Sequence, residues 1–253
     1  MKAALSWVMK YKWWLITAPF VFLVALQLYY FICIAWWVNF NPSSTSFMRE
    51  QLAVLREKNP KAELQHQWIP YQKISNHLKR AIIASEDSRF ATHEGVEWNG
   101  ILRAYKTNHR KHKIVAGGST ITQQLAKNLF LSSNRSYFRK LQELAITYML
   151  EFWMEKERIY ELYLNLVEFG VGVFGCEAAS RHYYGISAAH LSPVQAARLA
   201  ALLPKPRYFD THRNSAYLAH KTALILRRMG AAKTPEAIKK KTSRRPFYKL
   251  GTM

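Results

Sequence analysis

The sequence predicts a mostly α-helical domain behind one N-terminal transmembrane helix. In this chain of 253 residues, the stretch 13–38 is almost wholly apolar and carries no charge. Because about 20 apolar residues cross a bilayer as a helix, this run is long enough to span. In the remainder, apolar residues recur at helical spacing, and the alternating patterns typical of strands are scarce. A composition of 49% hydrophobic and 21% charged residues excludes disorder of the whole chain.

The flanks of the apolar run predict how it is oriented. Tryptophan pairs at 13–14 and 36–37 resemble the aromatic belts of membrane interfaces. Three lysines precede the run, whereas the basic residues just beyond it are offset by acidic neighbours. This asymmetry predicts a cytoplasmic tail over 1–12, a transmembrane helix over 13–38 and an external remainder. A cleaved signal peptide is the alternative, but the apolar core is too long and no small-x-small cleavage site follows it.

The elements beyond the membrane segment are predicted in chain order. Residues 39–70 are expected to be a linker and lead-in, because Pro42 and a Ser/Thr cluster follow the apolar run. Residues 71–230 are expected to form the main domain, and residues 231–253 a basic tail. Spacing and capping residues predict the helices of the main domain. The first runs from Ser75 through Glu86, and the second is capped by Ser119 and has an apolar stripe at Ile121, Leu125 and Leu129. One broken helix or two consecutive helices follow over 137–166. The last two are a helix that begins with Ser192 and Pro193 and reaches Leu203, and a helix over 214–229 that ends at Gly230.

The net charge of +21, from 37 Lys plus Arg against 16 Asp plus Glu, indicates a partner rich in negative charge. The basic excess from residue 205 to the end is typical either of a solvated tail or of a segment that contacts anionic lipid headgroups. No exposed helix combines base-reading and basic residues, and the external topology also argues against a nucleic-acid partner. Two cysteines are too few for a disulfide scaffold and fit no zinc spacing.

The first chemical motif is the run Glu86, Asp87, Phe90 and His93. If the helix from Ser75 continues, Glu86, Phe90 and His93 share one of its faces. A carboxylate beside another acid and near an aromatic ring is suited to take or give a proton near neutral pH. The simpler alternative is a surface acid pair near a helix end.

The second motif runs from Gly117 to Asn128. Two glycines before a Ser-capped helix leave backbone N–H groups free, and such helix starts favour anions. Opposite the apolar stripe, a polar face suited to sugar or phosphate holds Thr120, Gln123 or Gln124, and Lys127. A capped amphipathic helix without a ligand is the structural alternative.

The third motif contains Arg135, Arg139, Lys140 and Glu143. Arg139 and Glu143 could form an ordinary surface ion pair on a helix. Three cations exceed the need of one carboxylate, and the surplus could bind a pyrophosphate while keeping Glu143 ionised. Two glutamates in contrasting surroundings are the pattern expected of glycosyl chemistry.

In their order, these motifs resemble the monofunctional peptidoglycan glycosyltransferases, the family that also supplies the N-terminal domain of bifunctional penicillin-binding proteins. A fourth motif over 156–165 and a fifth over 191–204 complete the resemblance, which covers about 78–210. We expect the fourth motif, with Tyr163 and Asn165, to serve packing and capping before substrate contact. The resemblance implies a lysozyme-like fold with a catalytic lobe and a smaller, membrane-dipping lobe, so that 71–230 is the catalytic domain.

The resemblance also implies the reaction. Lipid II is the acceptor, and the donor is the growing glycan attached to undecaprenyl pyrophosphate. Glu86 would remove the proton of the acceptor 4-hydroxyl, which attacks the donor anomeric carbon, forms a β-1,4 link with inversion and releases undecaprenyl pyrophosphate. Glu143 is implied as the second catalytic glutamate. The substrate-binding residues implied are Asp87, Phe90, His93, Ser119, Thr120, Gln123, Gln124, Lys127, Arg135, Arg139 and Lys140.

No sequence motif requires a cofactor, although Mg²⁺ or Mn²⁺ can assist the pyrophosphate in some members of the family, and no metal ligand is identified. The expected partners are lipid II, the lipid-linked glycan chain, membrane lipids and proteins of cell-wall synthesis or division, with no nucleic acid. The expected location is the bacterial inner (plasma) membrane, with the catalytic domain periplasmic. A glycan-cleaving enzyme of the lytic transglycosylase or lysozyme type is the alternative, but its substrate has no pyrophosphate to explain the third motif.

Overall fold

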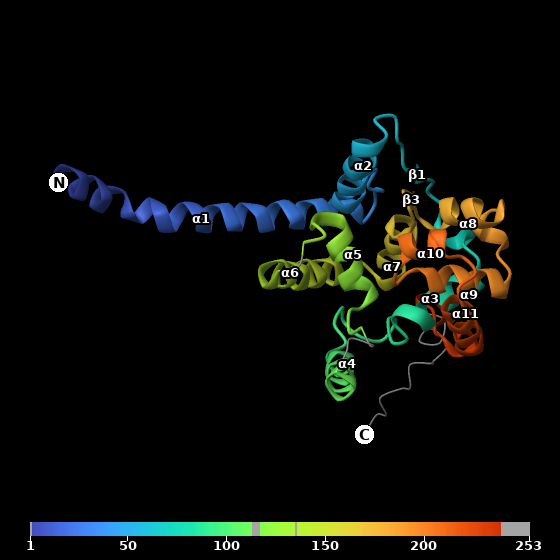
Figure 1. Ribbon diagram of the computed structural model, residues 1–253. Coiled ribbons are helices and arrows are strands. Elements are labelled where there is room, and N and C mark those ends of the chain that lie inside the picture. The colour runs from blue at the N-terminus through green and yellow to red at the C-terminus, as the bar shows by residue number, and fades with distance from the viewer. Residues whose placement is uncertain (1, 113–116, 135, 239–253) are drawn as a thin grey trace, which may run out of the picture. The chain divides into compact units, whose positions relative to one another are not determined.

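The computed structural model describes residues 2–112, 117–134 and 136–238, with side chains from residue 17 onward (Figure 1). The chain divides into two compact units, Met1–Asn41 and Pro42–Met253. Helix α1 (Lys2–Trp37) forms the first unit. Its part Thr17–Trp37 has a mean hydropathy of 2.1 and is long and apolar enough to cross a membrane, a test that a signal sequence also meets. Helix α1 begins at Lys2, so the predicted tail over 1–12 is helical where it is described.

The second unit is mostly helical, as the sequence predicts. Its elements in chain order are α2 (Ser46–Lys58), β1 (Gln65–His66), η1 (Tyr71–Lys73), α3 (Asn76–Glu86), α4 (Trp98–Lys111), α5 (Ile121–Phe130), α6 (Tyr137–Trp153), α7 (Lys156–Leu166), β2 (Glu168–Gly170), β3 (Val173–Phe174), α8 (Cys176–Tyr184), η2 (Ala188–His190), α9 (Pro193–Leu202), α10 (Pro206–Thr211), α11 (Ala216–Arg228) and η3 (Met229–Ala231).

Most predicted helices are present, with small shifts at their ends. The region 137–166 forms two helices, α6 and α7. Helix α9 begins with Ser192 as N-cap and Pro193 in the first turn, as predicted. The N-cap of α5 is Thr120 and not Ser119, because the Thr120 hydroxyl accepts from the backbone N–H of Gln123. Helix α11 starts at Ala216 behind the cap of Ser215, two residues later than predicted.

The compact unit begins before residue 71. Helix α2 lies within 39–70, where a linker was expected, and it packs against α5. Its N-cap Thr45 accepts from the N–H of Met48, whose side chain is buried. Strand β1 pairs in parallel with β3, and β2 pairs with β3 in the antiparallel sense, so the small sheet has the order β1-β3-β2. Residues 42–70 therefore belong to the folded unit.

The helices of this unit form two packed groups. Helices α3, α9 and α11 pack together, and α5 packs against α2, α6 and α7 (Figure 1). Alanines at 196, 197, 200 and 201 are fully buried on α9. Small side chains let α3 approach α9 closely and increase dispersion contacts. The packing of α3 against α9 and α11 therefore holds Glu86, at the end of α3, in a rigid frame.

The fourth motif is structural at Asn165, as predicted. Its Nδ2 donates to the carbonyl of Ile69 at 3.0 Å, while its Oδ1 accepts from the N–H of Ile69 at 2.8 Å. These two bonds tie the end of α7 to the segment before η1. Gly175 follows with φ +82°, and a Cβ there would lie 2.5 Å from the Asn165 carbonyl oxygen. Only glycine allows this close backbone approach.

The first part of the predicted tail folds against the domain. Glu236 accepts from the Tyr71 hydroxyl at 2.5 Å and lies 3.6 Å from the Lys79 ammonium of α3. The rest of the tail, 239–253, lies outside the described residues.

Candidate active site

Helix α3 ends at Glu86, and Asp87 is its C-cap. The expectation that Glu86, Phe90 and His93 share one helical face is therefore wrong. Asp87 leaves the helix because its Oδ2 accepts from the N–H of Ile121 at 3.1 Å and lies 2.9 Å from Nε2 of His93. These contacts join the end of α3 to the start of α5.

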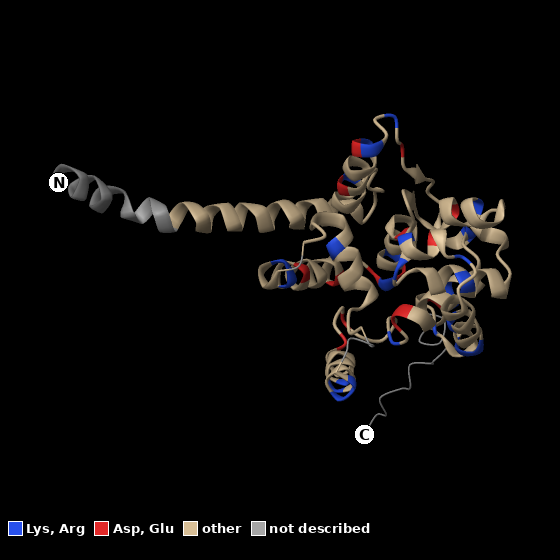
Figure 2. Cartoon of the chain, in the orientation of Figure 1, with Lys and Arg blue, Asp and Glu red and all other residues tan. Residues whose placement is uncertain are grey.

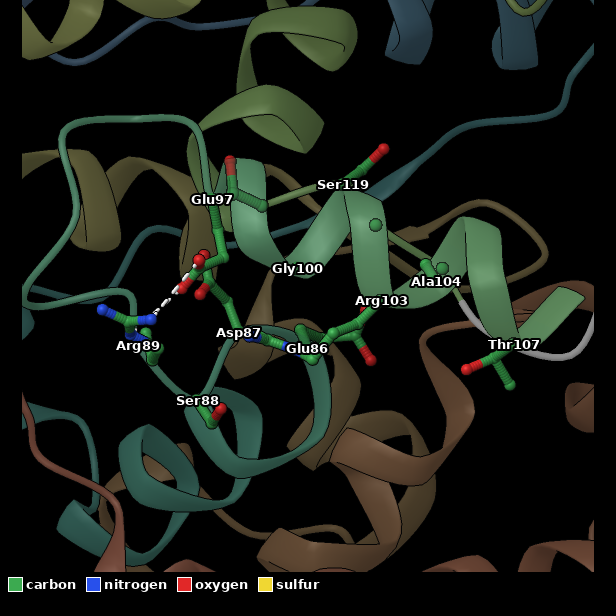
Figure 3. Close-up of a pocket in the computed structure, with 13 residues that line it drawn as sticks. Glu86, Asp87, Ser88, Arg89, Glu97, Gly100, Arg103, Ala104, Thr107 and Ser119 are labelled. Carbon is green, nitrogen blue, oxygen red and sulfur yellow. Dashed lines mark hydrogen bonds and ion pairs between the residues drawn. The ribbon is translucent and has the colours of Figure 1, made fainter.

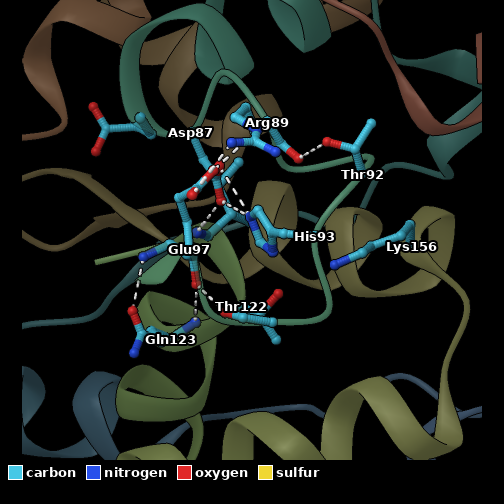
Figure 4. A network of polar contacts seen from close by, with 12 residues as sticks. Asp87, Arg89, Thr92, His93, Glu97, Thr122, Gln123 and Lys156 are labelled. Atoms are coloured by element: carbon cyan, nitrogen blue, oxygen red, sulfur yellow. Dashed lines mark hydrogen bonds and ion pairs between the residues drawn. The ribbon is translucent and has the colours of Figure 1, made fainter. Parts of the chain in front are cut away.

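A network of polar contacts surrounds the turn after Asp87 (Figure 4). Phe90 is fully buried, its ring 5.2 Å from that of Tyr160 and 4.8 Å from the Lys156 ammonium. The ring has no exposed surface in this conformation, so it supports the turn, and the substrate contact expected of Phe90 stays a prediction. His93 and Asp87 are also mostly buried, and they bind each other. Their contacts with each other hold the turn in place, and Asp87 also lines the pocket that contains Glu86.

Glu86 lies in a pocket of about 270 Å³ between the end of α3, the start of α4 and the loop before α5 (Figure 3). Its side chain is half-buried. One carboxylate oxygen, Oε1, accepts from the Ser85 hydroxyl at 2.9 Å, and Oε2 accepts from the Gln124 amide Nε2 at 3.2 Å. The carboxylate is thus oriented by two neutral donors at the edge of an accessible cavity.

The two adjacent glutamines of α5 have different surroundings. Gln123 is buried, and its Oε1 accepts from the N–H of Thr120 as part of a capping box. The Thr120 hydroxyl donates to the Gly95 carbonyl at 2.5 Å. The side chain of Gln123 therefore closes the helix start, and the sugar contact expected of it stays a prediction. Gln124, by contrast, reaches Glu86.

The third motif forms a cation cluster around Glu143, which is 3% exposed. Glu143 accepts from Arg139 at 3.0 Å and from the Lys140 ammonium. Figure 2 shows how basic and acidic residues are distributed along the chain. The Lys140 Nζ lies 3.5 Å from the exposed Ser119 hydroxyl. Burial lowers the pKa of Lys127 on α5, and the nearby charge of Glu143 opposes that shift. We refer to Lys127, Arg139, Lys140 and Glu143 as the cation cluster. Arg135 lies outside the described residues.

Helix α5 links the carboxylate pocket to the cation cluster. Gln124 contacts Glu86, and Lys127 of the cation cluster follows three residues later. Three residues of helix advance about 4.5 Å along its axis. The structure thus brings the two predicted parts of the site next to each other.

Two features near the site were not predicted from the sequence: Lys221, and the ion pair between Glu168 and Arg207. Lys221 of α11 is partly buried, which lowers its pKa, and the charge of Glu86 acts in the opposite direction. Glu168 is buried beside Arg207, with 2.9 Å between Arg207 Nε and a carboxylate oxygen. Burial raises the pKa of Glu168, and both Arg207 and Lys127 counteract this. Lys221 and Arg207 belong to the basic stretch after residue 205, where single cations form no recognisable motif.

The described residues contain no group of three or more His, Cys, Asp or Glu side chains that could hold a metal ion.

A carboxylate in a pocket beside a cluster of cations is the arrangement of an enzyme that transfers a group away from an anionic leaving group. The family model described as transglycosylase matches residues 51–230. Biosynthetic peptidoglycan transglycosylases of Herminiimonas arsenicoxydans and Janthinobacterium sp. (strain Marseille) are each 66% identical over 89% of this chain and 98% of their own length. That of Bordetella pertussis is 56% identical over 84% of this chain and 89% of its own. The chain belongs to the transglycosylase family, and the protein is a glycosyltransferase.

Proposed function

We propose that the protein polymerises lipid II into β-1,4-linked glycan strands of peptidoglycan and releases undecaprenyl pyrophosphate. The observation that carries this proposal is the link through α5 between Glu86 and the cation cluster. The relatives named biosynthetic peptidoglycan transglycosylases support the choice of glycan.

Glu86 acts as the general base. Its carboxylate accepts hydrogen bonds from Ser85 and Gln124, which orient its two oxygens. An acceptor sugar in the pocket places its 4-hydroxyl against this carboxylate. The proton passes to Glu86 while the hydroxyl oxygen bonds to the donor anomeric carbon from the side opposite the leaving group. Inversion follows from this geometry.

The cation cluster serves the leaving pyrophosphate. As the bond from the anomeric carbon to the phosphate oxygen breaks, negative charge grows on the diphosphate. Lys127 and Lys140 offer point charges, and Arg139 offers a planar fork. The carboxylate of Glu143 holds Arg139 and Lys140 in place before substrate arrives. Such preorganisation avoids the cost of rearranging these groups during the reaction.

The membrane segment places the enzyme at its lipid-linked substrate. The helix Thr17–Trp37 anchors the chain once in the inner membrane, with the N-terminus cytoplasmic and the catalytic domain periplasmic. Helices α4 and α6 also expose large apolar side chains that suit a membrane interface. These are Trp98, Leu102, Tyr105, Tyr137, Phe138, Leu141, Tyr148 and Phe152.

Incubation of the full-length protein in detergent with lipid II tests the proposal. The wild type is expected to form glycan polymer, and Glu86→Gln is expected to lose that activity while keeping its melting temperature. Glu94→Gln is the matched control, because Glu94 is exposed and lies outside the pocket lining. An inert mixture with lipid II, together with cleavage of purified cell wall, would instead establish a lytic enzyme. Full activity of Glu86→Gln would remove the proposed base.

A further inference from the structure

A chain of two hydrogen bonds runs from the interior of the protein to Glu86. The hydroxyl of Tyr163 on α7 donates to Oε1 of Gln124 at 3.0 Å. The Nε2 of the same amide donates to Oε2 of Glu86 at 3.2 Å. Gln124 therefore connects a buried phenol to the carboxylate that takes the proton.

Only one direction of these bonds is consistent. An ionised carboxylate can only accept, so the NH₂ group of Gln124 must face Glu86. The amide oxygen then faces Tyr163, whose hydroxyl must be the donor. Burial raises the pKa of Tyr163 well above its ordinary value, and the charge of Glu86 adds to the shift. The phenol therefore stays protonated and remains a donor at any pH at which the enzyme works.

Tyr163 is a fixed anchor. Its side chain is fully buried, so it cannot touch a substrate. Its ring stacks on that of Tyr160, with 6.5 Å between centroids and 23° between planes. Helix α7, which carries both rings, packs against α5 and Gln124. A side chain held in this way has one position available, and its hydroxyl selects one orientation of the neighbouring amide.

We propose that Tyr163 is a positioning residue, which holds the amide of Gln124 so that the Glu86 carboxylate points into the pocket with its basic oxygen toward the acceptor hydroxyl. The inference rests on the proposed function, because it assigns Glu86 the role of base. It gives the fourth motif a part in the reaction beyond packing. Misplacement of a reacting group by about 1 Å can cost about a hundredfold in rate.

Removal of the neutral Tyr163 hydroxyl takes no charge away from the surroundings of Glu86. Lys221 faces Glu86 from α11. The remaining ionisable groups lining the pocket are Asp87, Arg89, Glu97 and Arg103. A change in the pH profile of a Tyr163 variant therefore reports on the hydrogen-bond chain and not on a lost charge.

The test compares Tyr163→Phe with Tyr160→Phe in the lipid II assay. Both substitutions remove one buried hydroxyl from the same ring stack, and the hydroxyl of Tyr160 donates to the Lys79 carbonyl at 2.6 Å, away from Gln124. Without the phenol, the Gln124 amide can turn and withdraw its N–H from Glu86. Tyr163→Phe should lower kcat by about 10- to 100-fold at unchanged KM. The midpoint of the acid limb of its kcat/KM profile should move to higher pH by about half to one pH unit. Tyr160→Phe should show neither effect.

A second variant covers the case in which Tyr163→Phe does not fold. Gln124→Leu removes both bonds at a partly exposed position, and it should reproduce the fall in kcat and the shifted acid limb. Equal pH profiles and equal kcat for Tyr163→Phe and Tyr160→Phe would overturn the inference, as would a Gln124→Leu variant altered only in KM. Failure of the wild type to polymerise lipid II would be a different result, since it would remove the proposed function itself.

Discussion

The most informative perturbation of the cation cluster is Glu143→Gln. The substitution keeps the shape of the side chain and removes its charge. Arg139 and Lys140 then lose a common carboxylate, while the amide oxygen remains as one neutral acceptor. We expect losses in both stability and activity, because Glu143 is buried and holds Arg139 and Lys140, the cations to which the proposed function assigns the leaving pyrophosphate.

The loss of stability can be worked out from the exposure of the two cations. Arg139 is 18% exposed, and a hydrogen bond between charged groups at such a site contributes about 1.5–3 kcal/mol. Lys140 is 48% exposed, so water replaces its partner at a cost of about 0–1 kcal/mol. The neutral acceptor left by Gln recovers about 1 kcal/mol. The net destabilisation is about 0.5–3 kcal/mol, or about 1–12 °C in Tm for a domain of this size.

Two assays check this expectation. Thermal unfolding in detergent should give the stated fall in Tm, and the lipid II assay at a temperature well below that Tm should still show at least a tenfold fall in kcat/KM. Glu57→Gln is a matched control at an exposed position of α2. An unchanged Tm would refute the account of Glu143 as the partner of two cations. An unchanged kcat/KM in a destabilised variant would refute the link between the cation cluster and the leaving group.

Two further predictions concern Lys221 of α11, which lies near Glu86, and Asp210 of α10. Lys221→Met should lower kcat/KM by about tenfold or more, since it removes a cation facing Glu86. The Tm should stay equal or rise, because burial lowers the pKa of Lys221 and disfavours its charge in the folded state. Parallel losses of activity and Tm would contradict this prediction. For Asp210, burial alone would raise the pKa, but hydrogen bonds, chiefly from His182 and the N–H of Val171, lower it overall. The stability that this depressed pKa contributes is present above the unfolded value near 3.9 and is lost as the pH falls through the lower folded value. Urea unfolding across that range should therefore show a steeper loss in the wild type than in Asp210→Asn, and equal slopes would contradict the assignment.

The local pattern of the sequence predicted most helices, because their caps are neighbours in the chain. Ser75 accepts from a backbone N–H two residues later and Ser192 from one three residues later, and such bonds depend on nothing distant. The end of α3 could not be predicted in this way. Asp87 leaves the helix for a backbone N–H at Ile121, 34 residues further along the chain. Only the tertiary structure brings that donor to the carboxylate.

The candidate site shows the same division. The sequence indicated both glutamates and the cations of the third motif, because charged residues at helical spacing predict a common face. It could not distinguish Gln123 from Gln124, since adjacent helical positions differ by about 100° and the direction of the core was not known. Lys221 was missed for a similar reason. One lysine on an amphipathic helix becomes meaningful only when α11 is seen to face Glu86.

The contact of Glu236 with α3 bears on how this polypeptide can be shortened. The family match stops at residue 230, and a chain cut there would lose the carboxylate next to Lys79, whose ammonium is 4% exposed. A buried cation deprived of its counter-ion weakens the helix on which it sits. The same helix, α3, ends at Glu86, the carboxylate proposed as the base. A chain that ends at residue 230, six residues before Glu236, would therefore disturb Glu86 through the beginning of α3, where Lys79 lies.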